Sequence, residues 1–274
     1  MKRKRMQLLS IPYVFWIIGF TVIPLLFVFA KAATSPEGDA TFGNLIAIFD
    51  PVHRKALFLS IELAFVSSLV CILISYPAAL IIKSSKIRNK KTLQFIMILP
   101  MWMNFILRIL AIQMLISKNG IINHFLTAAG IGRINIINTE FAIVLGMVYD
   151  YLPYMLLPVL NGVLAIPDDI IEASKDLGAD RFTVLTKIML PLSLSAIGSG
   201  ITMVFVPSMT EFVIANILGG GKIQLLGNVI EQEFSVSMNW NLGSGLSVTL
   251  MVFVLLTTLI FGRGDSDKGR GFVI

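Results

Sequence analysis

Six long apolar segments restrict the fold of this chain more than any other feature of its sequence. Each segment has about 20 mostly apolar residues, the length that an α-helix needs to cross the hydrocarbon core of a bilayer. Because lipid cannot pair with backbone N–H and C=O groups, such segments are expected to be helical. The segments are expected at Pro12–Ala32, Leu57–Ile82, Leu93–Ile116, Phe141–Leu164, Leu190–Ile214 and Leu246–Phe261.

The composition leaves no stretch for a soluble domain. Hydrophobic residues make up 56% of the 274 residues and charged residues only 14%, whereas about 25% of a soluble domain is charged. We therefore predict an all-α, polytopic membrane protein that forms one membrane domain over residues 1–274. The net charge of +6 does not indicate nucleic-acid binding, because the basic residues lie between the apolar segments and not on one folded face.

Catalytic and metal-binding patterns are not visible in the sequence. The chain has one cysteine, Cys71, within an apolar segment, and its two histidines, His53 and His124, lie in different loops. There is no Walker motif and no arrangement of His, Cys or paired carboxylates of a catalytic kind. We expect no catalytic residues, no metal, no cofactor and no enzymatic activity in this chain.

The basic residues are distributed asymmetrically between the two sides of the membrane. Of the 22 lysines and arginines, 15 fall at the termini and in the 83–92 and 165–189 loops, 6 fall on the opposite side, and Arg108 lies within a segment. Cytoplasmic loops are enriched in lysine and arginine. Both termini and the 165–189 loop are therefore expected in the cytoplasm.

The 165–189 loop contains a predicted polar helix. Pro167 followed by Asp168 and Asp169 is typical of a helix start, because acidic side chains are favourable near the positive end of the helix dipole. We predict a helix over Asp168–Leu177, which Gly178 ends because glycine readily adopts a positive φ.

Small and charged residues occupy the middle of this helix. Ala173 and Ser174 would let a partner surface approach the backbone closely, and Glu172 offers a charged group to that partner. Leu190 and Pro191 mark the expected start of the fifth segment. The alternative is an ordinary amphipathic helix that lies at the membrane interface.

The spacing of Glu172-Ala173-Ser174, Gly178 and Leu190-Pro191 resembles the E-A-A loop of bacterial ABC importer permeases. In that family the loop forms a short coupling helix that docks into a groove of the ATPase subunit. Ser174 stands where the family usually has a third alanine, and it is also small.

The rest of the chain is similar to the PotB-type permease subunits of spermidine/putrescine importers. The resemblance is strongest in the stretches I-L-P-M-W-M-N-F-I-L-R-I-L (98–110), S-K-N-G-I-I-N (117–123), L-P-Y-M-L-L-P-V-L (152–160), V-P-S-M-T-E-F-V (206–213) and L-G-G-G-K-I-Q-L-L-G-N-V-I (218–230). It implies a type I importer transmembrane domain with a core over 57–262, preceded by an N-terminal helix and first outer loop over 1–56.

The same resemblance implies partners and a location. This chain would assemble with a second homologous permease, a dimer of ABC ATPase subunits and an extracellular polyamine-binding protein, in the lipid of the bacterial cytoplasmic membrane. Its cargo would be spermidine or putrescine. Other cargoes of the same kind of importer, such as another small cationic solute or an amino acid, stay open. An intramembrane enzyme would need a catalytic pair at matched depth, and a secondary transporter often shows an inverted repeat; neither is visible.

Polar residues within the apolar segments are candidates for the substrate pathway, because ionisable residues are rare there. Asp150 lies roughly 14 Å into the fourth segment, between Tyr149 and Tyr151. Carboxylates and aromatic faces attract cations, so Asp150 and Tyr151 are candidates for contact with a polyamine. Alternatively, Asp150 is a structural partner of Arg108, and the two roles are compatible.

Three further residues complete the predicted pathway. Glu211 follows Pro207 near the outer end of the fifth segment, where it is either an outer-gate contact or a carboxylate in headgroup water. Trp102 and Asn104 follow Pro100, which is expected to break the third segment. The alternative for Trp102 is packing in the core.

Overall fold

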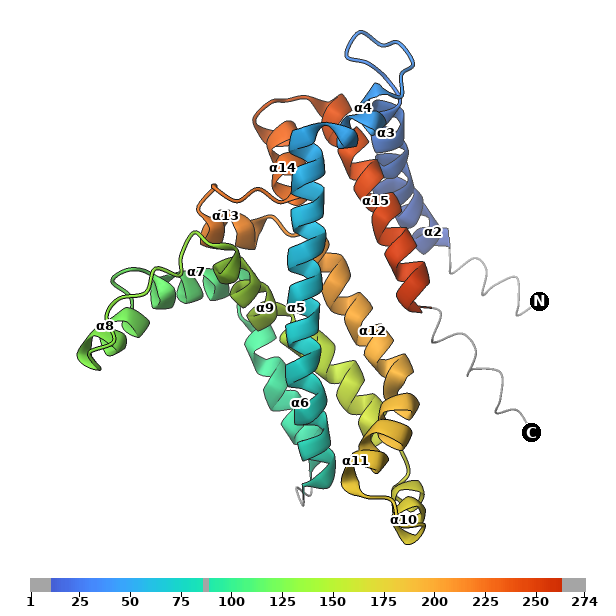
Figure 1. Ribbon diagram of the computed structural model, residues 1–274. Helices are drawn as coiled ribbons and strands as arrows, with labels where there is room; N and C mark the ends of the chain where they lie inside the picture. Colours follow the sequence, from blue (N-terminus) through green and yellow to red (C-terminus); the bar gives the residue numbers. More distant parts are fainter. Residues whose placement is uncertain (1–10, 86–88, 263–274) are drawn as a thin grey trace, which may run out of the picture. The chain divides into compact units, whose positions relative to one another are not determined.

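The computed structural model describes residues 11–85 and 89–262, and within them all regular structure is helical apart from one isolated antiparallel bridge between Thr34 and Ala40 (Figure 1). The basic N-terminal cluster, Lys86, Arg88 and the basic residues of the tail lie outside the described residues. The α-helices are α2 (Ile11–Ile17), α3 (Ile23–Ala32), α4 (Gly43–Ile46), α5 (Pro51–Ser84), α6 (Lys90–Ile98), α7 (Phe105–Ile116), α8 (Ile121–Ala128), α9 (Glu140–Leu164), α10 (Asp168–Asp176), α11 (Arg181–Thr183), α12 (Leu190–Met209), α13 (Val213–Gly219), α14 (Leu226–Ser235) and α15 (Trp240–Gly262). Two 3₁₀ segments, η2 (Ala47–Phe49) and η3 (Leu99–Trp102), and two π-helical segments, η1 (Ile18–Val22) and η4 (Val184–Met189), join some of them.

Six stretches of the described helices are long and apolar enough to cross a membrane, which confirms the predicted all-α class and the predicted number of spans. Five of them overlap the predicted first, second, fourth, fifth and sixth segments, although the ends differ by several residues. The stretches are Pro12–Ala32, Pro51–Ser84, Phe105–Ala128, Glu140–Leu164, Arg181–Met209 and Trp240–Leu259.

The predicted third segment is two helices and not one. After α6 the chain forms the 3₁₀ segment η3, which contains Pro100, and Met103 then takes an extended conformation with ψ of 149°. Asn104 caps α7 by accepting a hydrogen bond of 3.3 Å from the backbone N–H of Leu107. Proline lacks the N–H that would continue α6, and an asparagine cap favours a new helix start. The prediction of a break after Pro100 is confirmed, and the prediction of a span over Leu93–Ile116 is wrong.

The fifth predicted segment begins earlier than expected. The helical run starts at Arg181 and not at Leu190, because Asp180 caps it by accepting a hydrogen bond of 3.0 Å from the backbone N–H of Thr183. Pro191 lies in the first turn of α12, directly after η4. The wider π turn leaves room for the proline ring, which would collide with a carbonyl of a regular α-helix. Pro24 follows η1 in the same way.

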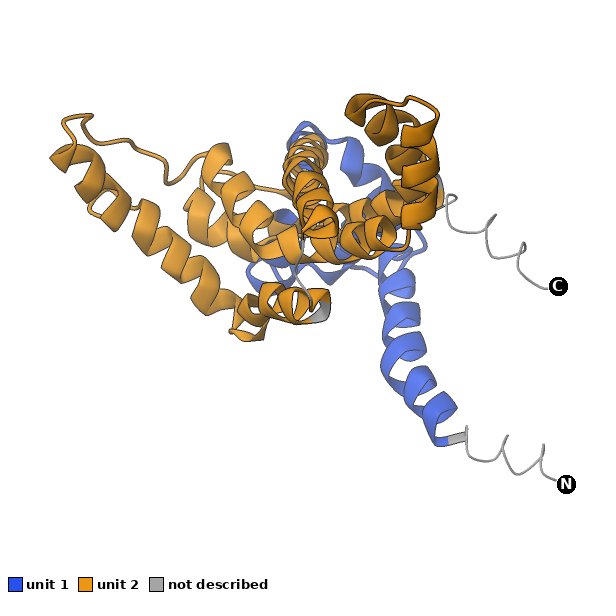
Figure 2. Ribbon diagram, turned by 90° about the horizontal axis from the view of Figure 1, so that it is seen from below, with its two compact units in different colours: residues 1–57, 229–253 blue, residues 58–228, 254–274 orange. Residues whose placement is uncertain are grey.

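The chain forms two compact units, residues 1–57 with 229–253 and residues 58–228 with 254–274 (Figure 2). In the second unit, α9 is the central helix. It contacts α6, α7, α12 and α13, and its buried residues lie on most of its circumference, as expected of a helix surrounded by others. They are Ala142, Ile143, Gly146, Met147, Val148, Asp150, Tyr151, Met155, Leu156, Val159, Leu160 and Val163.

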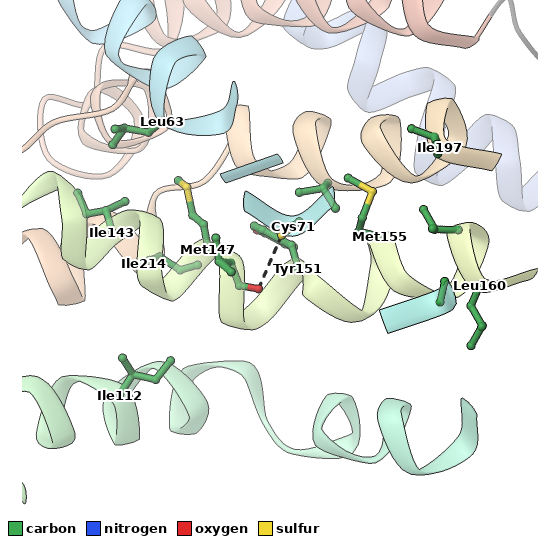
Figure 3. Packing of buried hydrophobic residues seen from close by; sticks show 14 of the residues in the cluster. Leu63, Cys71, Ile112, Ile143, Met147, Tyr151, Met155, Leu160, Ile197 and Ile214 are labelled. Carbon is green, nitrogen blue, oxygen red and sulfur yellow. Dashed lines mark hydrogen bonds between the residues drawn. The ribbon is translucent and has the colours of Figure 1, made fainter. Parts of the chain in front are cut away.

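Helix α5 packs against α9 through a row of small side chains. The hydroxyl of Ser67 lies 3.4 Å from the Met147 sulfur, and the Cys71 sulfur lies 3.9 Å from the backbone carbonyl oxygen of Val148 (Figure 3). Small side chains at such positions let two membrane helices approach closely. The single cysteine is therefore a buried packing residue.

In the first unit, two asparagine side chains pair with the carbonyl groups at the end of α3. Asn241 donates hydrogen bonds to the carbonyl oxygens of Lys31 (3.2 Å) and Thr34 (2.6 Å). Asn44 donates to those of Ala32 (3.2 Å) and Thr34 (2.8 Å). The last carbonyl groups of a helix have no partner within it, so these amides stabilise the end of α3.

The contact between α9 and α12 provides a test of the fold. A Cβ atom on Gly162 would collide with the Cβ atom of Ala196, which cannot move without its backbone. We expect Gly162→Val to destabilise the purified chain by about 1–3 kcal/mol, the usual cost of overpacking, measured by thermal unfolding in detergent. Gly19→Val is the matched control, because no atom lies within 4 Å of its added Cβ. Equal melting temperatures of the two variants would contradict the close α9–α12 contact.

Candidate functional site

Helix α10 lies where the sequence predicts it. It spans Asp168–Asp176 after an extended Pro167, with Asp168 and Asp169 in its first turn. Gly178 follows with φ of +84°, a conformation that other residues adopt only with strain, and its N–H donates a hydrogen bond of 2.8 Å to the carbonyl of Lys175. The predicted helix, its start and its end are therefore confirmed.

The motif residues of α10 lie on two different faces of the helix. Ser174 is buried and donates a hydrogen bond of 2.7 Å to the carbonyl of Ile171. Glu172 and Ala173 are exposed, and Leu177 next to them is 90% exposed. The small Ser174 thus packs inward, while an acidic, a small and a large apolar side chain together form an outward surface. Leu177 was predicted only as the last residue of the helix, although an apolar residue next to Gly178 at a helix end was a signal for a contact surface.

Lys83 fixes the position of α10. Its ammonium group donates a hydrogen bond of 2.6 Å to the carbonyl of Ile166 and lies 3.0 Å from the carboxylate of Asp168. The hydrogen bond from Lys83 and its charge lower the pKa of Asp168. The contacts join the last turn of α5 to the start of α10. From the sequence, Lys83 is only one of the basic loop residues, because its partner Asp168 lies 85 positions further along the chain.

Leu190 and Pro191, the last two residues of the predicted coupling loop, lie in the first turn of α12. Both are exposed. They continue the helical run that starts at Arg181 and passes through η4, and η4 in turn contacts α10. The loop and the span that follows are therefore one connected structure.

Two buried polar contacts involve neighbouring residues of α9. The guanidinium of Arg108 on α7 lies 2.6 Å from the carboxylate of Asp150, and the two residues are only 7% and 4% exposed. The predicted structural pairing of Asp150 with Arg108 is therefore confirmed. A buried carboxylate in a membrane segment is costly unless it is paired, which explains why the two charges are adjacent.

Glu211 holds the turn between α12 and α13. One carboxylate oxygen accepts hydrogen bonds from the backbone N–H groups of Val213 (2.7 Å) and Ile214 (3.0 Å), and the other accepts one of 2.5 Å from the hydroxyl of Tyr151. Glu211 is buried, so the alternative of a carboxylate in headgroup water is wrong for this structure. Among the described residues it has no basic partner within 4 Å.

The structure brings together only some of the predicted pathway residues. Asp150, Tyr151 and Glu211 meet around α9, where they are buried. Trp102 and Asn104 lie at the break between α6 and α7 and are exposed. Trp102 contacts the ring of Phe95 edge to face, with 5.6 Å between the ring centres, and is itself 72% exposed, so it is not a core residue of this chain.

Comparison with known proteins identifies similar chains. Residues 72–264 match the family described as binding-protein-dependent transport system inner membrane component. The chain is 33% identical to the spermidine/putrescine transport system permease protein PotB of Haemophilus influenzae, over 97% of this chain and 96% of that protein. It is 29% identical to the protein of the same name in Escherichia coli, over 91% and 94% of the two chains.

A solved structure shares the fold. It is the crystal structure of a bacterial alginate ABC transporter in complex with an alginate pentasaccharide-bound periplasmic protein. The matched chain has a TM-score of 0.75 and 16% identity, over 96% of this chain and 94% of that chain. At this identity the likeness concerns the fold alone.

The buried Arg108–Asp150 pair predicts a large effect on stability. We expect Arg108→Leu and Asp150→Leu each to lower the free energy of unfolding by about 3–5 kcal/mol, because each leaves one buried charge without its partner. The double variant should recover most of this loss, as measured by unfolding of the purified chain in detergent. Losses that simply add in the double variant would show that the pair does not interact.

The Lys83–Asp168 pair predicts a dependence of stability on pH. Because the pKa of Asp168 is lowered in the folded chain, the pair stabilises at pH values above about 4, the ordinary pKa of an aspartate. The contribution is lost as the pH falls through the lower, folded value. Wild type should therefore melt higher than Asp168→Asn at neutral pH, and the difference should vanish on acidification.

The neighbouring carboxylate serves as the control for this experiment. Asp169 is exposed in the same helical turn and makes no ion pair among the described residues. Asp169→Asn should therefore leave the melting temperature and its pH profile close to those of wild type. An equal change in both variants would mean that helix dipole effects, and not Lys83, cause the difference.

Proposed function

The chain belongs to the family of binding-protein-dependent transport system inner membrane components, and we infer from this that it is a permease subunit of an ATP-driven ABC importer for polyamines. With a second, homologous permease it forms the pathway for spermidine or putrescine across the bacterial cytoplasmic membrane. The assignment of a polyamine cargo rests on the similarity along nearly the whole chain to spermidine/putrescine permeases.

The buried polar cluster supports a cationic cargo. Arg108 neutralises Asp150, and Glu211 is bonded to neutral donors, the hydroxyl of Tyr151 and two backbone N–H groups. The cluster therefore holds one more carboxylate than cations. Such a site attracts a polyamine and disfavours an anion. Since the three acidic and aromatic side chains are buried here, cargo reaches them only when the helices around α9 move apart.

The outward face of α10 supports docking of an ATPase subunit. Glu172 supplies a charge, Ala173 lets the partner approach the backbone, and Leu177 supplies apolar area that would otherwise be exposed to water. In the proposed complex the ATPase subunit covers Leu177, which removes its exposed apolar area from water.

The remaining partners and the orientation follow the same proposal. The stretch Pro12–Ala32 has no residue of its most apolar window buried within the chain, which supports packing against a second permease or lipid. The ATPase dimer docks on the cytoplasmic side, where both termini also lie, and an extracellular binding protein delivers the polyamine. Residues 57–262 form the transport core. ATP is hydrolysed by the separate ATPase subunits and not by this chain.

In the proposed cycle, α10 transmits the movement of the ATPase subunits to the membrane helices of this chain. When ATP closes the ATPase dimer, the docked α10 moves with it. Because Lys83 joins α10 to α5, and because η4 contacts α10, the motion reaches the helices around α9. The pathway then opens outward and accepts the polyamine, and ATP hydrolysis returns it to the inward-open state.

A charge reversal on α10 tests the coupling role. We expect Glu172→Lys to reduce ATP-dependent uptake of labelled spermidine by about tenfold or more, equal to at least about 1.4 kcal/mol of coupling. The reason is that the ATPase groove would meet a cation in place of a carboxylate. Uptake is measured in proteoliposomes with the complete complex of both permeases, the ATPase and the binding protein.

Glu37→Lys serves as the matched control, because Glu37 is an exposed carboxylate far along the chain from α10 and forms no ion pair with any described residue. It should transport at the wild-type rate. Unchanged uptake in Glu172→Lys would contradict the coupling role. A wild-type complex that hydrolyses ATP but takes up arginine or another small cation, and no spermidine, would keep the importer and reject the polyamine cargo.

The double variant Arg108→Leu/Asp150→Leu separates two roles of Asp150 in the same assay. If Asp150 serves only as the partner of Arg108, the stable double variant transports spermidine normally. If it also contacts the cargo, the KM for spermidine rises while the complex still assembles.

A further inference from the structure

A hollow lies beside α10, on the side of the helix that carries Ile171 and Lys175. Its volume is about 850 Å³, within the range of about 300–1,000 Å³ that is usual for sites that hold small molecules. Helices α5, α10 and α11 and the segment η4 surround it. Its apolar wall includes Leu80, Leu185 and Met189, and three cations line it, Lys83, Lys175 and Arg181.

The charges of the hollow are not balanced within the chain. Lys83 is bonded to Ile166 and paired with Asp168. The one carboxylate in the lining, Asp180, accepts a hydrogen bond from the backbone N–H of Thr183, and hydrogen bonds from the side chain and the backbone of Thr183 lower its pKa. Lys175 and Arg181 are exposed and form no ion pair with any described residue.

The position of the hollow indicates what fills it. The apolar wall belongs to the end of one candidate span, α5, and to the beginning of another, the helical run that starts at Arg181. The unpaired cations come from the polar loop next to these ends. The apolar side chains match the acyl chains of a phospholipid, and the adjacent pair of unpaired cations matches its phosphate group.

A protein partner fits the hollow less well. Ile171 and Lys175 line the hollow, whereas Glu172, Ala173 and Leu177 do not. Residues three or four apart share a face of a helix, so Ala173 and Leu177 lie on one face of α10 and Ile171 and Lys175 on another, with Glu172 beside Lys175 at the border between them. A partner that covers Ala173 and Leu177 therefore leaves the hollow open to the membrane.

We propose that the hollow binds an anionic phospholipid of the surrounding leaflet. The acyl chains lie against Leu80, Leu185 and Met189, and the phosphate group lies between Lys175 and Arg181. Phosphatidylglycerol is the appropriate probe, and zwitterionic phosphatidylcholine is the matched lipid without net charge. Each cation near an anionic lipid contributes about fivefold to the affinity.

The test counts bound lipids on the assembled permease–ATPase complex by native mass spectrometry, with phosphatidylglycerol or phosphatidylcholine added in detergent. We expect a phosphatidylglycerol that binds at least about tenfold more tightly than phosphatidylcholine. The variant Lys175→Gln/Arg181→Gln should lose this preference. Both side chains are exposed, so folding should be retained, and the two single variants serve if the double variant does not assemble.

The control removes two cations elsewhere. Lys118 and Arg133 line a smaller hollow of about 200 Å³ whose lining is mainly polar. Lys118→Gln/Arg133→Gln should keep the preference for phosphatidylglycerol. An equal loss in this control would mean that general charge attraction explains the binding, and it would overturn the proposal.

Three further outcomes would overturn it as well. These are an absence of preference in the wild-type complex, displacement of the lipid by millimolar glycerol 3-phosphate, and binding to the separate permease that disappears when the ATPase assembles. The second would mean that a soluble phosphate compound is the natural ligand. The third would mean that the hollow belongs to the ATPase interface. None of them depends on which cargo the importer carries.

Discussion

The requirement that every backbone polar group find a partner in a water-poor environment determines much of this structure. Where an apolar segment is broken, a side chain replaces the missing backbone partner. Asn104 caps α7, and Glu211 accepts hydrogen bonds from the first two backbone N–H groups of α13. Lipid offers no hydrogen bonds to a broken helix, so each break needs its own acceptor. The polar residues within the apolar segments therefore have a structural reason to be there, besides any role in transport.

This double role changes how the site is interpreted. Glu211 closes the turn before α13 and also bonds to Tyr151 on the central helix, so it joins the break to the core. A substitution that removes the Glu211 carboxylate would loosen the start of α13 and would also remove any contact of Glu211 with the cargo. The two effects could not be separated in one variant. Tyr151 offers a cleaner separation, because loss of its hydroxyl leaves both backbone bonds of Glu211 intact. The roles of Asp150 can be separated in the same way, because replacing Arg108 together with Asp150 leaves no buried charge without a partner.

Much of the fold could be predicted because the length of an apolar segment and the residues that start or end a helix are visible within a short stretch of sequence. The segments around α5, α9 and α10 follow from these signals alone, and Asp150 could be matched with Arg108 because both are ionisable residues in apolar segments. The start of the fifth span at Arg181 could not be predicted in this way. A proline usually marks a helix start, whereas Pro191 follows the π turn of η4 inside a longer helical run. The Lys83–Asp168 contact joins residues 85 positions apart, so it depends on the assembled helices.

Helix α10 connects these observations, because each of its faces has a different neighbour. Its inward residue Ser174 packs within the loop, Lys83 ties its first turn to α5, and Leu177 points outward. If α10 were connected to the protein only through the chain at its two ends, a movement of the docked partner would bend the loop and go no further. Because Lys83 connects α10 to α5, the movement also displaces α5, whose small side chains pack directly on α9. In the proposed importer the contact at Lys83 is therefore part of the coupling path, together with the contact between α10 and η4.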